Sequence, residues 1–370
     1  MDMEHMYELK GTEAIISPSL IYYEEIIREN IKKTIRTAGS PERLWPHVKS
    51  HKSIDMVRMQ MEYGITKFKT ATVAEAEMAA MAGAQRVILA YPLVGPNMER
   101  FVRLAKAYPD TIFYGVEDDR AQFEALSRVC VEHDAVLPML VDVNMGMNRT
   151  GVPIEGLEEL YRFAYSLPGL RLCGMHCYDG NHNNKDAAVR RAEVDDTDRR
   201  VADIMERLTG DGICCELAVA GGTPSFPCHA DCTRWYLSPG TAFITDAGYY
   251  MNLPDLDFIP GAAVMTRVIS HPAEGVFTTD LGYKAIASDP AGQRGFIVGL
   301  EDAVPIIHSE EHWAFRLEDK SRIPAMGTCL YVIPTHICPT TALYPEILVA
   351  KEGRVAARWQ VTARNRRITY

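Results

Sequence analysis

The chain has 370 residues, of which 47% are hydrophobic and 24% charged, and its 49 acidic and 39 basic side chains give a net charge of −10. This length suggests two domains, or one barrel-sized domain with an appendage, and the composition is that of an ordinary globular protein. The acidic balance argues against nucleic acids and anionic membranes as partners, although it does not exclude a local positive pocket for a phosphate.

The N-terminal sequence and the cysteines predict a cytoplasmic location. Met1–His5 is acidic and lacks the basic start and apolar run of a signal peptide. No run of the sequence approaches the ~18 apolar residues of a membrane span. The nine cysteines are an odd number and are scattered through apolar segments, unlike the framework of a secreted scaffold. We therefore expect reduced thiols.

One amphipathic helix and eight short strands are predicted over the first two thirds of the chain. The helix covers Tyr22–Ala38, where isoleucines recur at helical spacing. Eight apolar runs follow, each bounded by turn signals: Leu44–Lys49, Thr66–Lys69, Val87–Tyr91, Thr111–Val116, Leu137–Val143, Leu170–Tyr178, Cys215–Ala220 and Trp235–Ser238. Amphipathic stretches fill most of the gaps: Ala74–Met81, Met98–Tyr108, Arg120–His133 and Asp198–Leu208. This alternation indicates parallel strands joined by crossover helices.

The number of these units predicts a closed barrel. Eight strand–helix units in a row fit a (β/α)8 barrel of the TIM type. The competing fold, a doubly wound open sheet, usually shows a GxGxxG-type turn after its first strand, and none follows Leu44–Lys49. We therefore predict an α/β fold with the barrel over residues 15–248.

After Asp246 the helical periodicity ends and short strand-like runs crowd together. They are Val264–Ile269, Gly275–Thr279, Phe296–Val298, Val304–Ile307, Cys329–Ile333, Glu346–Ala350 and Val355–Val361. Glycine and proline separate them, as expected of a small antiparallel β domain. We assign this domain to residues 249–370 and expect residues 1–14 to join it.

Glycine-containing loops follow the last two strands of the predicted barrel. In such barrels the active site lies at the C-terminal ends of the strands, and a phosphate often binds after strands seven and eight. Those strands are followed here by Gly221-Gly222-Thr223 and Pro239-Gly240-Thr241. Each loop offers unobstructed backbone N–H groups and a hydroxyl, which suit a dianionic phosphate. One such loop is often only a turn, but two at the expected places predict a phosphate site.

Two basic residues follow strands one and five. His47, Lys49 and His51 share one face of an extended segment. A lysine that enters a barrel mouth beside a phosphate site is a candidate for Schiff-base chemistry with pyridoxal phosphate, and a solvated lysine at a surface strand end is the alternative. Arg149 stands in a loop between two glycines, where it could approach a flat anionic cofactor or lie exposed in an ordinary turn.

Further polar segments lie after strand six and in the β domain. Tyr178 precedes the polar loop Asp179–Asn184 and could contact a cofactor or simply plug the barrel. His336 and Cys338, two residues apart in an extended segment, could chelate Zn²⁺ or Mn²⁺ with water or substrate completing the site. The segment Cys228–Cys232 looks equally metal-like, but we interpret it as a loop with incidental thiols, because nothing places it near the barrel mouth.

Taken in order, these segments resemble those of the D-threonine aldolase and D-serine dehydratase family, pyridoxal-phosphate enzymes of fold type III that share the barrel of alanine racemase. Pro46–Lys52 is similar to the family's lysine segment, which implies Lys49 as the Schiff-base residue. The resemblance implies Arg149 and Tyr178 beside the cofactor and a homodimeric assembly. It further implies a phosphate cup and a metal-binding pair, made respectively of Gly221, Gly222, Thr223, Gly240 and Thr241, and of His336 and Cys338.

Two departures from the aldolase pattern of this family favour dehydration. The aldolases follow the metal-binding histidine with an aspartate two residues later, where this chain has Cys338, as the dehydratases do. They also carry a catalytic histidine six residues after the tyrosine, where this chain has Asn184. Asparagine cannot accept a proton from a substrate hydroxyl at neutral pH, so that base is missing unless His182 replaces it.

We therefore predict a lyase that depends on pyridoxal phosphate and a divalent metal, Zn²⁺, Mn²⁺ or Mg²⁺. Its expected substrate is a D-3-hydroxy amino acid such as D-serine or D-3-hydroxyaspartate, converted to a keto acid and ammonia, with Lys49, Tyr178 and His182 as catalytic residues. Retro-aldol cleavage to glycine and an aldehyde is the alternative. A racemase would leave His336 and Cys338 without a role, and a non-catalytic cofactor carrier would not need the β domain.

Overall fold

The computed structural model describes residues 4–369. Met1–Met3, which belong to the acidic start and to the segment expected to join the β domain, lie outside the described residues, as does Tyr370. The chain divides into two compact units. The barrel unit comprises Thr34–Gly240 with the described residues from Asn365 onward, and the β unit comprises the described residues up to Lys33 together with Thr241–Arg364.

The barrel unit is built on a parallel sheet with the strand order β2-β3-β4-β5-β7-β8-β9. Its strands are β2 (Lys67–Thr70), β3 (Arg86–Leu89), β4 (Ile112–Glu117), β5 (Leu137–Asn144), β7 (Leu170–Cys177), β8 (Leu217–Ala220) and β9 (Trp235–Leu237), and β6 (Val152–Pro153) pairs with β5. Leu44 forms a parallel bridge with Leu237 of β9, and His47 forms one with Lys69 of β2. Residues 44–47 therefore close the ring, which confirms the predicted (β/α)8 class.

The first predicted strand, Leu44–Lys49, is reduced to these two bridges. Pro46 has no N–H to donate to a neighbouring strand, and Val48–Ser50 forms the 3-10 turn η2. Lys49 lies in this turn and not in an extended segment, so the prediction that it shares one strand face with its neighbouring histidines is wrong.

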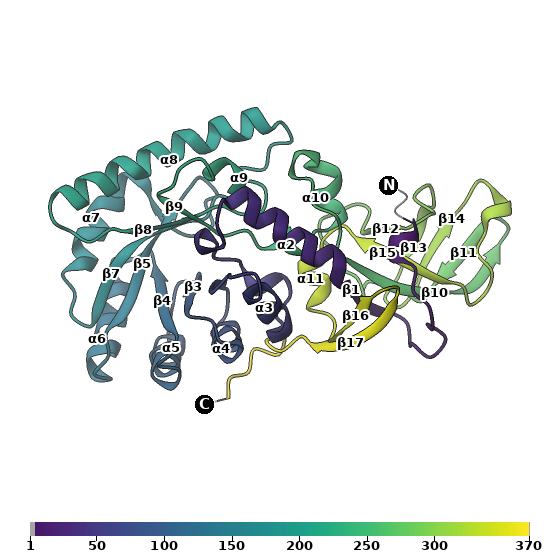
Figure 1. The fold of residues 1–370 in the computed structure, drawn as a ribbon, viewed down its shortest axis with the longest axis horizontal. Coiled ribbons are helices and arrows are strands. Elements are labelled where there is room, and N and C mark those ends of the chain that lie inside the picture. Colours follow the sequence, from purple (N-terminus) through teal and green to yellow (C-terminus); the bar gives the residue numbers. More distant parts are fainter. Residues whose placement is uncertain (1–3, 370) are drawn as a thin grey trace. The chain divides into compact units, whose positions relative to one another are not determined.

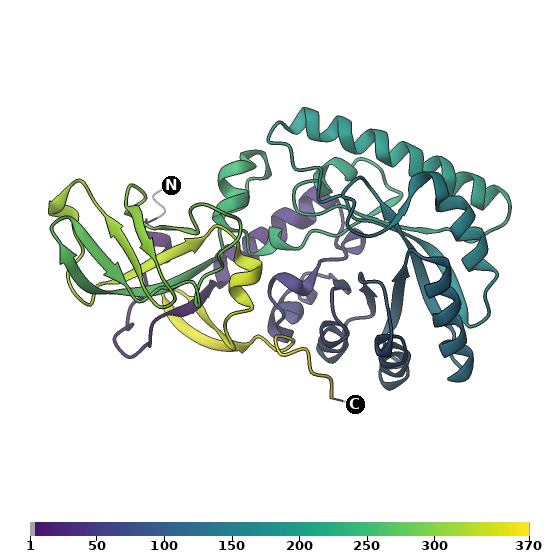
Figure 2. The same cartoon turned by 180° about the vertical axis from the view of Figure 1, so that it is seen from behind.

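Helices cover the outer side of the parallel sheet (Figures 1 and 2). They are α3 (Ile54–Met61), α4 (Val73–Ala82), α5 (Pro96–Ala107), α6 (Arg120–Glu132), α7 (Ile154–Tyr165), α8 (Ala187–Gly210) and α9 (Phe226–His229), preceded by α2 (Glu24–Ala38) and η1 (Pro41–Arg43). The predicted helices correspond to α2, α4, α5, α6 and α8, although α8 begins at Ala187 and not at Asp198. No helix in residues 4–369 combines the length and the apolar character needed to cross a membrane.

The barrel interior is apolar below its mouth. Trp45, Ile88, Val116, Leu140 and Val219, one from each of five positions around the ring, are fully buried in one cluster. Polar side chains are buried at the C-terminal ends of the same strands, and these are described with the candidate site.

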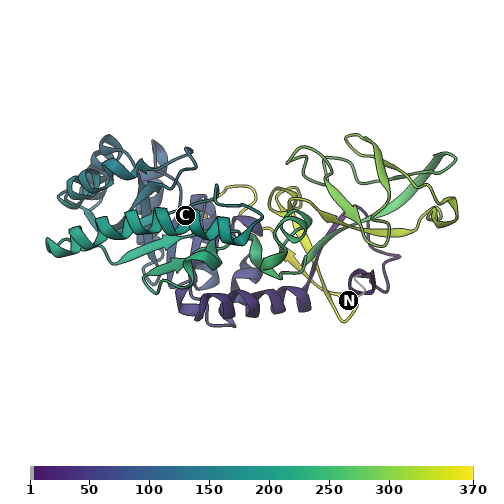
Figure 3. The same ribbon diagram turned by 90° about the horizontal axis from the view of Figure 1, so that it is seen from above.

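The β unit holds a nine-stranded sheet with the order β13-β14-β11-β10-β1-β16-β17, in which β15 pairs with both β10 and β12. Its strands are β1 (Ser19–Tyr23), β10 (Ala262–Ala273), β11 (Val276–Thr279), β12 (Gly295–Ile297), β13 (Val304–His308), β14 (Trp313–Arg316), β15 (Cys329–Pro334), β16 (Glu346–Lys351) and β17 (Arg354–Gln360). Its helical segments are α1 (Glu4–Tyr7), η3 (Thr241–Phe243), α10 (Ala247–Asn252), η4 (Pro254–Leu256), η5 (Lys320–Arg322) and α11 (Ile337–Thr341). Figure 3 shows how strongly β10 and its neighbours twist within this unit.

Pairing in this sheet is antiparallel except between β1 and β16, which run parallel. The sequence predicts neither β1 nor β14. Because β1 pairs with β10, residues that the sequence places at the start of the barrel belong to the β unit. The compact units are therefore bounded at Lys33 and Thr241, where the sequence places the boundaries at 15 and 248.

Candidate active site at the barrel mouth

Lys49 presents its amine at the C-terminal end of the barrel. The turn that carries it is fixed by the His47 side chain, which accepts the Lys49 N–H, and by the Ser50 hydroxyl, which donates to the backbone oxygens of His47 and Gly240. The Lys49 side chain is half-buried, and its Nζ forms no hydrogen bond or ion pair with any residue in the described part of the chain. The amine is therefore available to a ligand.

Three cationic side chains surround the ring of Tyr178, which directly follows β7. The Nζ of Lys49 lies 5.7 Å from the ring centroid, and the guanidinium carbon of Arg149 lies 4.9 Å from it. The third cation is Lys69, whose Nζ lies 5.2 Å from the same centroid. The structure thus brings together Lys49, Arg149 and Tyr178 as the sequence predicts, and this positive field suits an anionic ligand.

Lys69 is a site residue that was not predicted from the sequence. Its side chain is 1% exposed, and its Nζ donates to the Ser238 hydroxyl at 2.5 Å and lies 3.5 Å from Nε2 of His176. Nδ1 of His176 is in turn 2.7 Å from Oδ1 of Asp142. Burial and the nearby Lys49 charge lower the pKa of Lys69 to about 7. Its position at the C-terminal end of β2 could have flagged it, because that is where catalytic side chains gather in this fold.

The two predicted phosphate loops lie side by side, because β8 and β9 pair through Ala220 and Leu237. The Ser238 hydroxyl joins them by donating to the backbone oxygen of Gly221 at 2.8 Å. Gly221 has φ +83°, a conformation that favours glycine. A Cβ on Gly222 would lie 3.2 Å from the Tyr178 ring, which is a tight contact. Glycine therefore leaves room for the loop backbone to lie close to the ring.

One predicted phosphate donor of these loops is already used. The Gly222 N–H donates to the Ser225 hydroxyl at 3.0 Å, and so it does not point outward to a ligand. Thr223 is buried beside it, and Gly240 packs against His47, where a Cβ would lie 3.2 Å from the histidine Cβ. Glycine at both positions therefore allows close approach of the chain to neighbouring groups.

A buried charge network supports the first of these loops from behind. Ser225 donates to Oδ1 of Asp179 at 2.6 Å, and Nε2 of His229 lies 2.8 Å from Oδ2 of the same carboxylate. Nδ1 of His229 lies 2.7 Å from Oδ2 of Asp198. Burial alone would lower the pKa of His229, but the two carboxylates raise it to about 10, and the charged histidine holds the pKa of Asp179 well below its usual range.

This network gives a supporting role to His229, which the interpretation of Cys228–Cys232 as a loop with incidental thiols overlooked. His229 ends α9 and is fully buried, in contact with the residue that follows Tyr178. The sequence could not reveal it, because its two aspartate partners are 31 and 50 positions away.

His182 and Asn184 occupy different environments in the loop after β7. The His182 ring is buried, with Nδ1 3.5 Å from Oδ2 of Asp179, and the His182 backbone N–H donates to the backbone oxygen of Asp179. Asn184 is exposed, and its side-chain oxygen accepts the Asp186 N–H near the start of α8. The histidine is therefore directed toward the supporting network.

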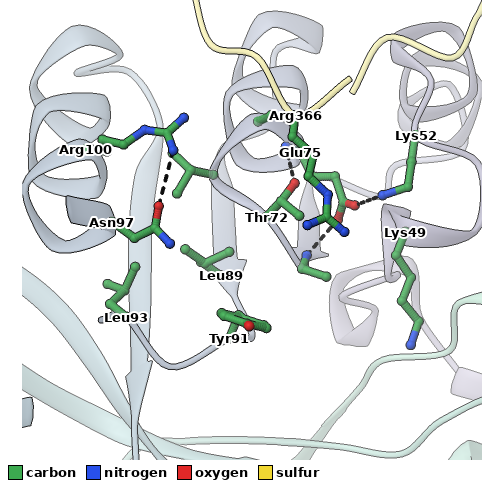
Figure 4. Close-up of a pocket in the computed structure, with 13 residues that line it drawn as sticks. Lys49, Lys52, Thr72, Glu75, Leu89, Tyr91, Leu93, Asn97, Arg100 and Arg366 are labelled. Atoms are coloured by element: carbon green, nitrogen blue, oxygen red, sulfur yellow. Dashed lines mark hydrogen bonds and ion pairs between the residues drawn. The ribbon is translucent and has the colours of Figure 1, made fainter. Parts of the chain in front are cut away.

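A cavity of about 460 Å³ opens beside Lys49 between the ends of β2 and β3 (Figure 4). Lys52 pairs with the buried Glu75 on its wall, and Figure 4 shows the Lys49 amine pointing away from that pair. Arg100 and Arg366 also line it. Basic side chains therefore line this cavity, as they line the space around the Tyr178 ring.

The predicted metal-binding pair lies in the β unit at the start of α11, where His336 is the N-cap and Cys338 lies within the helix. The prediction that the two share an extended segment is therefore wrong. Nδ1 of His336 is 2.9 Å from Oδ2 of Asp289, which leaves Nε2 for a metal, the usual arrangement of a ligating histidine. Although burial would lower it, Cys338 and the nearby carboxylates raise the pKa of His336 to about 9. Cys338 Sγ lies 3.2 Å from the Thr241 hydroxyl.

These donors fit a divalent metal with an incomplete protein shell. Imidazole and thiolate are ligands that Zn²⁺ accepts readily. Within residues 4–369, no group of three or more His, Cys, Asp or Glu side chains is placed to hold a metal. Two protein ligands leave coordination positions for water or substrate, which is the character of a catalytic metal site.

Comparison with known proteins identifies two matching family models. Residues 24–245 match the alanine racemase N-terminal domain, and residues 261–350 match the putative serine dehydratase domain. A solved structure of D-threonine aldolase from Filomicrobium marinum is 28% identical and superposes with a TM-score of 0.88, covering 95% of this chain and 97% of the other.

Three relatives align over nearly the whole chain. D-threonine aldolase of Arthrobacter sp. is 28% identical over 87% of this chain and 85% of its own. 3-hydroxy-D-aspartate aldolase of Paracoccus denitrificans is 26% identical over 95% and 93%, and D-threo-3-hydroxyaspartate dehydratase of Delftia sp. is 22% identical over 85% and 88%. The family resemblance predicted from the sequence is thereby confirmed.

Proposed function

The chain belongs to the alanine racemase N-terminal domain family, and from this premise we propose that it is a pyridoxal-phosphate-dependent lyase that dehydrates a D-3-hydroxy amino acid. The observation that carries the proposal is the Lys49 amine, which forms no hydrogen bond with the described residues and lies near the ring of Tyr178, as do two further basic side chains. An available amine in a cationic pocket suits a cofactor that carries both an aldehyde and a phosphate.

The cofactor would be held by residues at the C-terminal ends of the strands. Lys49 would hold it covalently, while Arg149 and Tyr178 would lie against its ring. The phosphate would be received by the two loops, Gly221-Gly222-Thr223 and Gly240-Thr241. When bound, pyridoxal phosphate supplies an electron sink for the charge that develops at Cα. With the substrate bound, the Lys49 amine would serve as the base that accepts the Cα proton.

His336 and Cys338 would hold a divalent metal, Zn²⁺, Mn²⁺ or Mg²⁺, with Asp289 orienting the imidazole. A metal held there supplies a Lewis acid that helps a substrate hydroxyl to leave. Water or substrate would complete its coordination.

Dehydration is favoured over retro-aldol cleavage by the loop after β7. Cleavage of the Cα–Cβ bond needs a base that takes the proton of the substrate hydroxyl. Asn184 cannot accept that proton, and the His182 ring is buried against Asp179. The alternative is nevertheless a retro-aldol lyase, which the names of two aligned relatives support.

The test is a substrate panel with product identification. Purified protein is supplied with pyridoxal phosphate and Mn²⁺ or Zn²⁺ and is offered D-serine, D-threonine and D-3-hydroxyaspartate beside their L-forms. We expect keto acid and ammonia from D-forms alone. Glycine with an aldehyde would instead establish the aldolase alternative, and inverted substrate would establish a racemase.

Two variants separate the lysine chemistry from general loss of charge. Lys49→Ala should lose turnover and the visible absorbance of the lysine-bound cofactor. Lys67→Met removes a lysine at the N-terminal end of β2, where it lies over the Tyr236 ring. This variant should keep both the turnover and the absorbance. If Lys49→Ala retained the absorbance, the assignment of Lys49 would be wrong.

A further inference from the structure

The proposed reaction gives no role to Lys69, although this lysine is the most deeply buried cationic group at the barrel mouth. Its side chain is 1% exposed, and the β-bridge between His47 and Lys69 fixes its backbone beside the turn of Lys49. The amine faces the Tyr178 ring from 5.2 Å. Lys69 therefore shares the ring with the lysine proposed to hold the cofactor.

The hydrogen-bond partners of the Lys69 amine within residues 4–369 are neutral groups. It donates to the Ser238 hydroxyl and lies 3.5 Å from Nε2 of His176. Because Nδ1 of His176 donates to Asp142, Nε2 can accept from the lysine, and the carboxylate stays one imidazole away. An ammonium ion has three donors, so two such partners leave one hydrogen without an acceptor. Burying an ammonium ion without a contacting anion is unfavourable.

We infer that Lys69 is a cofactor-binding residue whose amine takes up a proton when the anionic phosphopyridoxyl ligand binds. This inference rests on the proposed function, because it needs a cofactor of this kind at the barrel mouth. The third donor of Lys69 would then contact an anionic oxygen of the ligand. The Ser238 hydroxyl, which receives the first donor, also binds the backbone of Gly221 in the first phosphate loop.

The charges that face Lys69 come from several elements. Lys49 on η2 and Arg149 after β5 disfavour its charged form, whereas Asp142 on β5 and Asp179 after β7 favour it. His176 on β7 contributes little charge, because burial lowers its pKa. Together with burial these groups lower the pKa of Lys69 to about 7, so the free amine is largely neutral at pH 8.

The sign of the linkage follows from this pKa. A bound anion favours the ammonium form and raises the pKa of Lys69 in the complex. Binding is therefore strongest below pH 7, and it weakens as the pH rises from about 7 toward the raised pKa of the complex. The dissociation constant should increase by up to roughly tenfold per pH unit in that window.

The probe is pyridoxine 5′-phosphate, which carries the ring and phosphate of the cofactor but has no aldehyde and forms no bond to Lys49. Its dissociation constant is measured by fluorescence between pH 7 and 9 for the wild type, Lys69→Met, Lys69→Gln and the control Lys67→Met. We expect the wild type and Lys67→Met to lose affinity with rising pH. The two Lys69 variants should bind more weakly at pH 7 and should show a flatter profile.

A second measurement does not depend on the folding of any variant. Calorimetry of the wild type at pH 8 in two buffers of different ionisation enthalpy counts protons, and roughly one should be taken up per ligand bound. If inorganic phosphate alone causes this proton uptake, Lys69 contacts the phosphate group. If only the phosphopyridoxyl ligand causes it, Lys69 contacts the phenolic oxygen on the pyridine ring.

The outcomes separate this inference from the proposed function. Equal affinities and equal pH profiles of the wild type and both Lys69 variants, or no proton uptake by the wild type at pH 8, would overturn the role of Lys69 alone. Absence of binding of the probe to the wild type at every pH would instead contradict the cofactor site itself.

Discussion

Individual side chains around Tyr178 decide what the barrel mouth can bind. Three cations lie within 6 Å of its ring centroid, at 5.7, 5.2 and 4.9 Å. The electron-rich face of the ring attracts a cation placed over it. Tyr178 is therefore expected to hold Lys49 and Arg149 in place before any ligand arrives, and to attract Lys69 once its amine is protonated.

Truncation of this ring should weaken cofactor binding. In Tyr178→Ala the cations lose the aromatic face, a loss of about 1–2 kcal/mol, so the dissociation constant for pyridoxine 5′-phosphate should rise roughly tenfold or more. Tyr178→Phe keeps the ring and should stay within about threefold of the wild type in this titration. Equal weakening in both variants would show that the hydroxyl, and not the ring, makes the contribution.

His182 tests whether the chain retains an aldolase base. Its buried ring faces Asp179, so we expect His182→Ala to keep its turnover within about tenfold of the wild type, below the 10²–10⁴-fold effect of removing a general base. The measurement is the initial rate on the best substrate of the panel, with thermal unfolding as the control for folding. A loss of a hundredfold or more without destabilisation would restore His182 as a catalytic base.

Among the secondary-structure elements, the short α9 contributes most to the support of the site. Its last residue, His229, ties the loop after β7 to α8 through Asp179 and Asp198. Ser225, just before α9, links the same carboxylate to the backbone of Gly222. One buried histidine thus fixes the element that carries Tyr178 and the first phosphate loop.

Loss of this histidine should destabilise the protein in a pH-dependent way. His229→Asn leaves Asp179 buried without its cationic partner and should lower the free energy of unfolding by about 3–5 kcal/mol at pH 6. The folded-state pKa of about 10 exceeds the usual 6.5, so this contribution is fully present below about pH 6.5 and is lost as the pH rises toward 10.

Urea unfolding from pH 6 to 10 checks this prediction. The difference between the wild type and His229→Asn should shrink steadily with pH. His312, which is exposed in the β unit, provides the control His312→Asn, expected to unfold like the wild type. A constant difference across the pH range would mean that His229 is neutral in the folded state.

The elements also show where sequence periodicity is sufficient and where it is not. Apolar runs bounded by turn signals predict β2 to β5 and β7 to β9 closely, while the two-residue β6 was not predicted. Lys49 and Tyr178 were found because each ends a predicted strand. The run Ser19–Tyr23 was missed because it continues without a break into the helical pattern of α2. Lys69 also ends a predicted strand and could have been recognised in the same way. His229 was missed because its importance comes from partners far along the chain, which no local pattern encodes.

For the molecule as a whole, net charge is a poor guide to the ligand. The chain carries a net charge of −10, yet its barrel mouth gathers Lys49, Lys69 and Arg149 around one ring. The division into two units also divides the chemistry, with the amine in the barrel unit and the His336–Cys338 pair in the β unit. The proposed reaction needs both the amine and the metal. Because they belong to different units, each can be removed without changing the other.

Removal of the metal should abolish turnover but not cofactor binding. We expect a chelator to lower the rate by at least about a hundredfold, because a Lewis acid contributes several kcal/mol to the departure of a hydroxyl. His336→Ala should lose activity to a similar extent and should not respond further to the chelator. His271→Ala, a change at an exposed histidine of the same unit, should behave as the wild type. An unchanged rate in chelated His336→Ala would remove the metal from the mechanism.

The most direct single measurement is the amount of ammonia released per D-3-hydroxy amino acid consumed by the holoenzyme. Dehydration yields one keto acid and one ammonia for each substrate, whereas retro-aldol cleavage retains the nitrogen in glycine. We predict a ratio close to one with D-serine or D-3-hydroxyaspartate, and no release from Lys49→Ala. A ratio near zero with glycine accumulating, or equal release from D- and L-forms, would contradict the proposed D-specific dehydration.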